Sequence, residues 1–142
     1  MEDSNTMIFM HKRGDVQRLR GVLRLGALVF VISSIILLTL PRIFTDLLAL
    51  PGSTGLDWAM QMTGVVIFTL SGLMFVSAQS GSDSAVLWVA RVMMVGAFGL
   101  GVLTLLIPTG VNWFVILYAL IGFGFSTGYL VFLFRKNPRV EN

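Results

Sequence analysis

Cysteine is absent from this chain, and charged residues are scarce. Without cysteine, the chain can form no disulfide, no thiolate metal site and no cysteine nucleophile. Charged residues make up 12% of the 142 residues, whereas a soluble domain carries about 25%. Hydrophobic residues make up 56%, and the mean hydropathy is +0.87. Such a chain has too little polar material to cover a surface that faces water, so we predict an integral membrane protein that contacts the lipid bilayer.

Acidic and histidine side chains are missing from the long apolar stretches of the chain. Asp57 only borders one of these stretches, and the one histidine, His11, precedes all of them. Proton-coupled exporters and pumps usually carry a carboxylate within the membrane. Small multidrug exporters, whose first helix holds a glutamate, are therefore disfavoured. Haem ligation by a histidine within the spans is excluded, and we expect no cofactor.

Sequence motifs of enzyme and metal sites are absent as well. No nucleophile-elbow, Walker or zinc-protease pattern occurs. Met60 and Met62 in "MQM" suggest a soft-metal site, but residues two apart on a helix point away from each other. Filling of the core by flexible thioethers is the better account of the methionines. An enzyme is the least favoured class of protein, and we expect no catalytic or metal-binding residue.

Four apolar runs dominate the chain, each close to the roughly 20 residues that a helix needs to cross the hydrocarbon core. They cover residues 22–40, 58–78, 86–107 and 113–134. The predicted fold class is all-α, an integral membrane, antiparallel bundle of four transmembrane helices over residues 22–142. The runs leave no room for a separate soluble domain.

Residues 1–24 form the predicted cytoplasmic N-terminal segment. Arg13, Gln17, Arg20 and Arg24 follow helical spacing and form one stripe, with an apolar stripe beside it. This pattern predicts a short basic amphipathic helix that lies at the membrane surface and continues into the first span. Its arginines either bind anionic lipid head groups or a cytoplasmic partner, or only fix topology during insertion. Because the basic residues lie beside the spans, nucleic acid is not an expected partner.

The connections between the runs carry turn and capping signals. In the first loop, residues 41–57, "RIFTDLLAL" predicts a short interfacial helix in which Arg42 and Asp46 form an i, i+4 pair. Asp57 is the predicted N-cap of the second span, and Asp83 or Ser84 that of the third. The third loop, "PTGVN", is only five residues long, so the last two spans are expected to form an antiparallel hairpin.

Basic residues are concentrated on one side of the predicted membrane. The N-terminal segment and the C-terminal tail together hold eight of them, whereas the first loop holds only Arg42. Under the positive-inside rule, this distribution places both termini in the cytoplasm, in agreement with an even number of spans. The predicted localisation is the cell membrane.

Glycines recur in the last two spans, where small residues let helix backbones approach closely. Either they pack the two helices of this hairpin together, which is the simpler interpretation, or they form a homodimer face or a pore. The glycines concerned are Gly96, Gly99, Gly101, Gly122, Gly124 and Gly128.

Arg91 is the one charged residue inside the third run. It lies ~8 Å inside that run by the helical rise, and its long side chain can reach back to the head groups. Trp88, one turn earlier, is expected to stack on it as a cation–π partner, and Tyr129 of the last span is expected at a similar depth. We interpret these residues as interfacial anchors. The alternative is that Arg91 binds an anionic lipid or ligand.

Gln61 is the most demanding polar residue of the second span, because an amide has several hydrogen-bonding sites to satisfy. It lies about one turn inside the outer interface, where water can reach it. A contact with a substrate is the alternative hypothesis for this residue.

The order of these features resembles that of the small bacterial four-helix membrane proteins called DoxX-like. The segments that carry the resemblance are "LPRIFTDLLALPG", "WAMQMTGVVIFTLSG" and the glycines of the last two spans. The resemblance implies a left-handed antiparallel bundle. Many members have no settled activity, and some are accessory subunits of membrane oxidoreductases. No functional residue is carried over from it.

Together, these observations predict a small non-catalytic membrane protein. We expect it to act as an accessory or scaffold subunit through helix–helix contacts, with a membrane protein or a second copy of itself as partner. The alternative is a small oligomeric transporter or channel.

Overall fold

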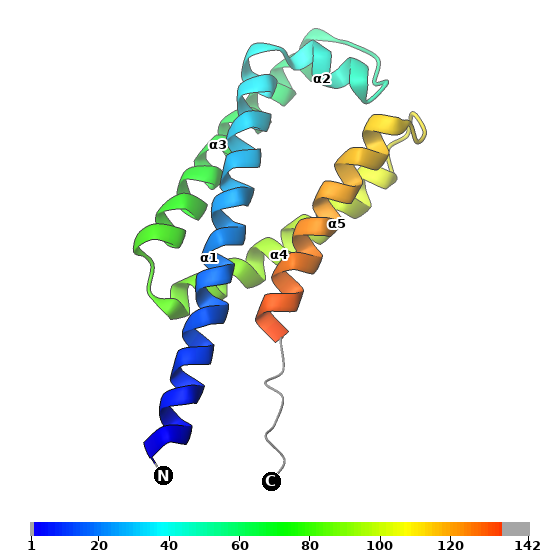
Figure 1. Ribbon diagram of the computed structural model, residues 1–142. Coiled ribbons are helices and arrows are strands. Elements are labelled where there is room, and N and C mark those ends of the chain that lie inside the picture. The colour runs from blue at the N-terminus through cyan, green and yellow to red at the C-terminus, as the bar shows by residue number, and fades with distance from the viewer. Residues whose placement is uncertain (1, 135–142) are drawn as a thin grey trace.

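The structure, a computed structural model, describes residues 2–134, apart from the side chains of residues 2–13 and Asp15. No strand occurs between residues 2 and 134, so the all-α prediction is confirmed. Five helices make up nearly all of this part (Figure 1): α1 (Glu2–Thr39), α2 (Pro41–Leu47), α3 (Thr54–Ser80), α4 (Asp83–Leu105) and α5 (Trp113–Phe134).

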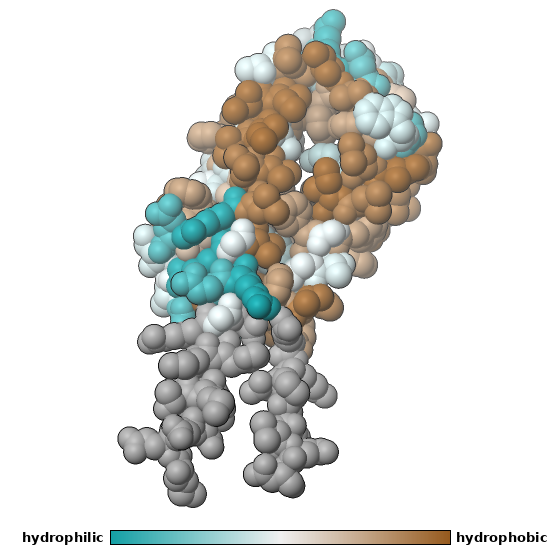
Figure 2. Space-filling model, in the orientation of Figure 1, coloured by the Kyte–Doolittle hydropathy of each residue, from teal (hydrophilic) through white to brown (hydrophobic). Residues whose placement is uncertain are grey.

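Four of these helices are long and apolar enough to cross a membrane. They are α1 over Val16–Thr39, and α3, α4 and α5 over their whole lengths. At most 28% of the residues in any of their apolar windows are buried within the chain. The remaining apolar side chains form an outer surface (Figure 2) that water would solvate poorly. The predicted apolar spans are thus confirmed as helices.

Helix α1 continues without a break from Glu2 to Thr39. The predicted amphipathic surface helix is therefore not a separate element, because its backbone extends the first span along the same axis (Figure 1). The reason lies in the apolar stripe beside the arginines. Val16, Leu19 and Leu23 are buried in a cluster that includes Val86 of α4, so they pack on the rest of the chain instead of resting on lipid.

The first loop contains the predicted short helix, α2, which is attached to the other helices by aromatic contacts. The Phe44 ring is only 8% exposed. It meets Phe114 and Tyr118 of α5 edge to face, at centroid distances of 5.7 and 5.6 Å, a geometry that aromatic pairs prefer. Helix α2 therefore links the end of α1 to the beginning of α5.

Arg42 pairs with Asp57, not with Asp46 as predicted. Its Nε lies 2.9 Å from Oδ2 of Asp57, and this hydrogen bond and the carboxylate charge raise the pKa of Arg42 above its ordinary value. The predicted capping role of Asp57 is also wrong, since α3 begins earlier, at Thr54. Ser53 caps α3 by accepting a hydrogen bond from the backbone N–H of Leu56 at 3.1 Å.

The caps of the last two long helices are side chains just before each helix. Ser82 caps α4 by accepting from the backbone N–H of Ala85 at 3.3 Å, so the predicted cap at Asp83 or Ser84 is wrong. Asp83 is instead the first helical residue, where a carboxylate is favourable because of the helix dipole. Asn112 caps α5 by accepting from the backbone N–H of Val115 at 2.9 Å.

The long helices associate as two pairs, α1 with α3 and α4 with α5 (Figure 1). Two groups of buried side chains hold the pairs together. One group, near the α3–α4 connection, includes Leu19, Met74 and Val86. The other, next to α2, includes Leu37 and Val115. Between the two groups the pairs leave a cavity, which is described below.

Candidate functional site

Arg20 joins α1 to the connection between α3 and α4. Its guanidinium donates to the carbonyl oxygens of Ala78 at 3.0 Å and Gly81 at 2.7 Å, and to Oδ1 of Asp83 at 3.1 Å. The side chain is only 16% exposed. Carbonyls in the last turn of a helix have no partner within that helix, so Arg20 satisfies groups that would otherwise be open. This side chain, for which a lipid head group was one of the alternative partners, makes contacts within the chain.

Arg24 belongs to the same predicted basic stripe and lines the same groove as Arg20, but it is more exposed. It is exposed, and with Gln17 and Gln79 it lines an open polar groove on the outside of the α1–α3 pair. Its guanidinium is therefore available to a head group. The side chain of Arg13, for which lipid contact was one of the alternatives, lies outside the described residues.

Arg91 and Trp88 form the predicted cation–π pair on the outer face of α4. The guanidinium carbon of Arg91 lies 4.9 Å from the centroid of the Trp88 ring. Both side chains are exposed, Trp88 to 63%. Arg91 is ~12 Å from the first residue of α4 by the helical rise, because the helix begins earlier than the apolar run. The pair faces outward, as an interfacial anchor would.

Tyr129 does not share this outer surface. Its side chain is 1% exposed and belongs to the buried group that includes Leu19, Leu23 and Met74. Its hydroxyl is buried with no hydrogen-bond partner among the described residues. Buried polar groups are nearly always hydrogen-bonded, so this hydroxyl is the feature of the interior that most needs an explanation.

The six predicted packing glycines divide into three groups. Gly101 and Gly122 are buried against each other, since a Cβ on Gly122 would lie 3.1 Å from Cα of Gly101. A Cβ on Gly128 would only touch Val22 at 4.0 Å. The other three have nothing within 4 Å of an added Cβ: Gly96, Gly99 and Gly124. The α4–α5 hairpin is therefore packed through Gly101 and Gly122. Gly96, Gly99 and Gly124 do not contribute to this packing.

Gln61 is exposed, and its amide nitrogen lies 3.4 Å from the carbonyl oxygen of Leu38 on α1. This long hydrogen bond contributes to the contact between α1 and α3. The other hydrogen-bonding sites of the amide are not used by this contact.

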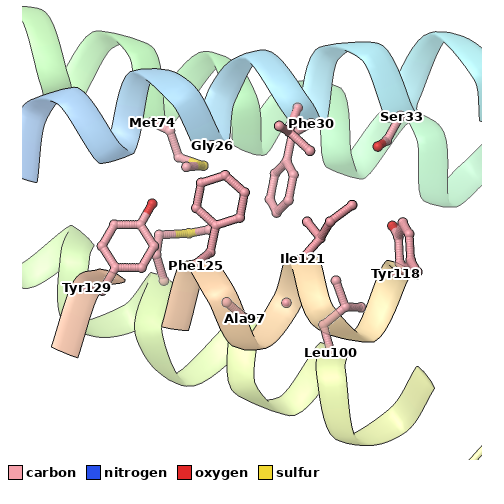
Figure 3. Close-up of a pocket in the computed structure, with 13 residues that line it drawn as sticks. Gly26, Phe30, Ser33, Met74, Ala97, Leu100, Tyr118, Ile121, Phe125 and Tyr129 are labelled. Atoms are coloured by element: carbon pink, nitrogen blue, oxygen red, sulfur yellow. The ribbon is translucent and has the colours of Figure 1, made fainter. Parts of the chain in front are cut away.

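The cavity between the two helix pairs was not anticipated from the sequence. We call it the slot. It is drawn in Figure 3, and all four long helices contribute to its walls. Residues that define it are Gly26, Ser33, Met74, Ala97, Tyr118 and Tyr129. The one sequence feature that pointed to it is Gly26, a small residue in the first span that Met74 and Tyr129 can approach closely.

Among the residues that the structure describes, no group of side chains could hold a metal ion.

Comparisons with protein-family models, with curated proteins and with solved structures found no match. The fold and the apolar outer surface therefore indicate a class, a multi-pass membrane protein with four candidate spans.

Proposed function

We propose that this chain is a non-catalytic accessory or scaffold subunit of a membrane complex, inserted in the bilayer as an antiparallel four-span bundle. Its outer α4 face binds a helix of the partner. The observation that carries this proposal is the open space at Gly96 and Gly99, where an added Cβ would meet nothing within 4 Å. The chain leaves this part of α4 unused for its own packing.

The outer α4 face has the form that helices use to associate in lipid. Gly96 and Gly99 are three apart and lie on the same side of the helix. Exposed aliphatic side chains flank them, namely Val92, Val95 and Leu103, each at least 66% exposed. Without a hydrophobic driving force between helices, association depends on close backbone approach and van der Waals contact. Gly96 and Gly99 allow close approach, and the aliphatic side chains beside them provide van der Waals contact.

Filling this depression is expected to release the partner. We expect a Gly96→Leu/Gly99→Leu double variant to lose about tenfold in affinity for the partner, which corresponds to ~1.4 kcal/mol. Native mass spectrometry of the complex, extracted in a gentle detergent, measures the loss. Gly72→Leu on α3 is the matched control, because Gly72, like Gly96, is exposed and has nothing within 4 Å of an added Cβ.

Two results would contradict the scaffold proposal. One is a wild-type chain that is extracted as a monomer with no stoichiometric partner. The other is an equal loss in the Gly72→Leu control. A homo-oligomer that conducts a specific flux in liposomes would favour the alternative, a small transporter or channel.

The orientation in the cell membrane belongs to the same proposal, with both termini in the cytoplasm. Exposed Arg24 lines a groove together with Gly81 and Asp83 of the α3–α4 connection, whereas Arg42 belongs to α2, which lies at the opposite end of the long helices (Figure 1). Exposed Trp58 and Trp113 also lie at the α2 end, at 63% and 67% exposure. The tryptophans support the position of the interfaces, and the excess of arginine at the other end, with Arg18 and Arg20 beside Arg24, supports this orientation. The Arg91–Trp88 pair then serves as an anchor near the inner interface.

Single-cysteine labelling tests the orientation without background, because the chain has no cysteine of its own. In intact cells, a membrane-impermeant maleimide is expected to label Gly52→Cys in the first loop. It is expected to label Ser84→Cys at the start of α4 only after the membrane is permeabilised. Both positions are exposed, so accessibility depends on the side of the membrane alone. The reverse pattern would refute the orientation.

A further inference from the structure

The slot between the two helix pairs is long and thin. On α5 it extends from Tyr118 to Tyr129, which is ~16 Å by the helical rise. It contains ≈ 450 Å³ of unfilled space when its open mouth is counted, but only ≈ 30 Å³ is wide enough for the centre of a water molecule. A cavity that admits a benzene ring measures about 150 Å³. The enclosed part is smaller than a benzene site, so a ligand must lie largely in the open part of the slot, along which an unbranched chain can extend between the helix pairs.

The walls of the slot are apolar along most of their length. Phe30, Met74 and Ile121 face the space between the α1–α3 pair and the α4–α5 pair (Figure 3). Gly26 lets Met74 and Tyr129 approach α1 closely, since an added Cβ would lie 2.8 Å from Cε of Met74 and 3.2 Å from Oη of Tyr129. An apolar cavity of this kind is a poor place for water, which needs several polar partners.

Tyr129 supplies a hydrogen-bond donor at one end of the slot. Its hydroxyl points toward α1 beside Met74 (Figure 3), and it has no partner among the described residues. The other hydroxyls that line the slot, those of Ser33 and Tyr118, lie at the far end. A ligand that satisfies Tyr129 must therefore bring its own acceptor atom. In a molecule that dissolves in a bilayer, a carbonyl oxygen attached to an aliphatic chain meets this requirement.

The position of the slot agrees with access from the bilayer. The face between α1 and α5 is apolar and hollowed (Figure 2), so a chain can enter sideways without crossing water. Tyr129 lies toward the basic end, ~8 Å from the last residue of α5 by the helical rise. From Tyr129 the slot leads away from the arginines. An acyl chain whose carbonyl is near the basic head-group region would enter in this direction.

We infer that the slot binds one acyl chain, with its carbonyl oxygen accepting a hydrogen bond from Tyr129 and its methylene groups extending toward Tyr118. A free fatty acid and the ester chain of a phospholipid share this chemistry. The binding does not depend on the partner helix at the outer α4 face, because the slot lies between the two helix pairs.

Photolabelling of the full chain in phospholipid nanodiscs tests the inference. One arm uses palmitic acid with a diazirine on its chain, and the other uses phosphatidylglycerol that carries the same chain. In at least one arm, label is expected on residues 26–33 and 118–129, and the arm that labels identifies the source of the chain. Unlabelled palmitic acid or its methyl ester is expected to compete.

Two tyrosine variants provide a matched comparison, since each removes one hydroxyl and keeps the ring. Tyr129→Phe is expected to weaken competition about fivefold, as loss of one hydrogen bond does, whereas Tyr118→Phe stays within about twofold of wild type. Ala97→Leu, which fills the slot, is expected to abolish its labelling. Label spread evenly over outward residues such as Phe68 and Val92 would overturn the inference. So would equal effects of the two tyrosine variants.

Discussion

Replacement of Arg20 by alanine is expected to lower the free energy of unfolding by about 2–4 kcal/mol, since hydrogen bonds from a charged donor contribute about 1.5–3 kcal/mol each. The variant leaves the carbonyl oxygens of Ala78 and Gly81 without their donor. These groups lie near the edge of the apolar region, where replacement hydrogen bonds from water are harder to obtain than in a soluble protein. The α3–α4 connection also loses its attachment to α1.

The controls for Arg20 separate geometry from charge. Arg20→Lys is expected to restore only part of the stability, because an ammonium cannot span carbonyl groups as a planar guanidinium does. Asp83→Asn is expected to cost at most about 1 kcal/mol, because exposed ion pairs contribute little and the Asp83 side chain is 63% exposed. Arg24→Ala should have no effect on stability. Unfolding in mixed micelles, followed by circular dichroism, measures all four variants. Equal losses from Arg20→Ala and Arg24→Ala would contradict the argument.

The contrast between Arg20 and Arg24 shows what local sequence patterns leave open. Their spacing places both on one stripe of a helix, and that much was predictable. Which of them turns toward the chain depends on Ala78 and Gly81, about sixty residues further along. The long helices, by contrast, were predictable because the length and composition of each apolar run are sufficient to define them.

The caps and the buried tyrosine were predicted less well, for physical reasons that differ. Ser82, Asp83 and Ser84 follow one another, and each is able to cap a helix, so the choice depends on where packing of α4 starts the helix. Tyr129 resembles the aromatic residues of a membrane interface. It is buried instead because Gly26, in a helix distant in sequence, leaves space for its hydroxyl. The slot and its donor therefore exist only once α1 and α5 come together.

Gly122 is the second position where one added carbon is expected to have a large effect. A Cβ there would lie 2.9 Å from the carbonyl oxygen of Ala97 and 3.1 Å from both N and Cα of Gly101. All three atoms are backbone, so no side-chain rotation can relieve the contact, and α4 and α5 must move apart. We expect Gly122→Ala to destabilise the chain by about 3 kcal/mol, toward the upper end of overpacking effects.

Two other glycines of the same hairpin make this prediction a graded series. The three atoms nearest to an added Cβ on Gly101 all belong to the ring of Phe123, at 3.0 to 3.2 Å. Because a ring can turn aside, Gly101→Ala should cost less than Gly122→Ala. Gly124 has nothing within 4 Å, so Gly124→Ala should be neutral or stabilising by up to about 1 kcal/mol through helix propensity. The same unfolding measurement ranks the three variants. If Gly122→Ala and Gly124→Ala, only two residues apart, were equally stable, the close approach of α4 and α5 through Gly101 and Gly122 would be refuted.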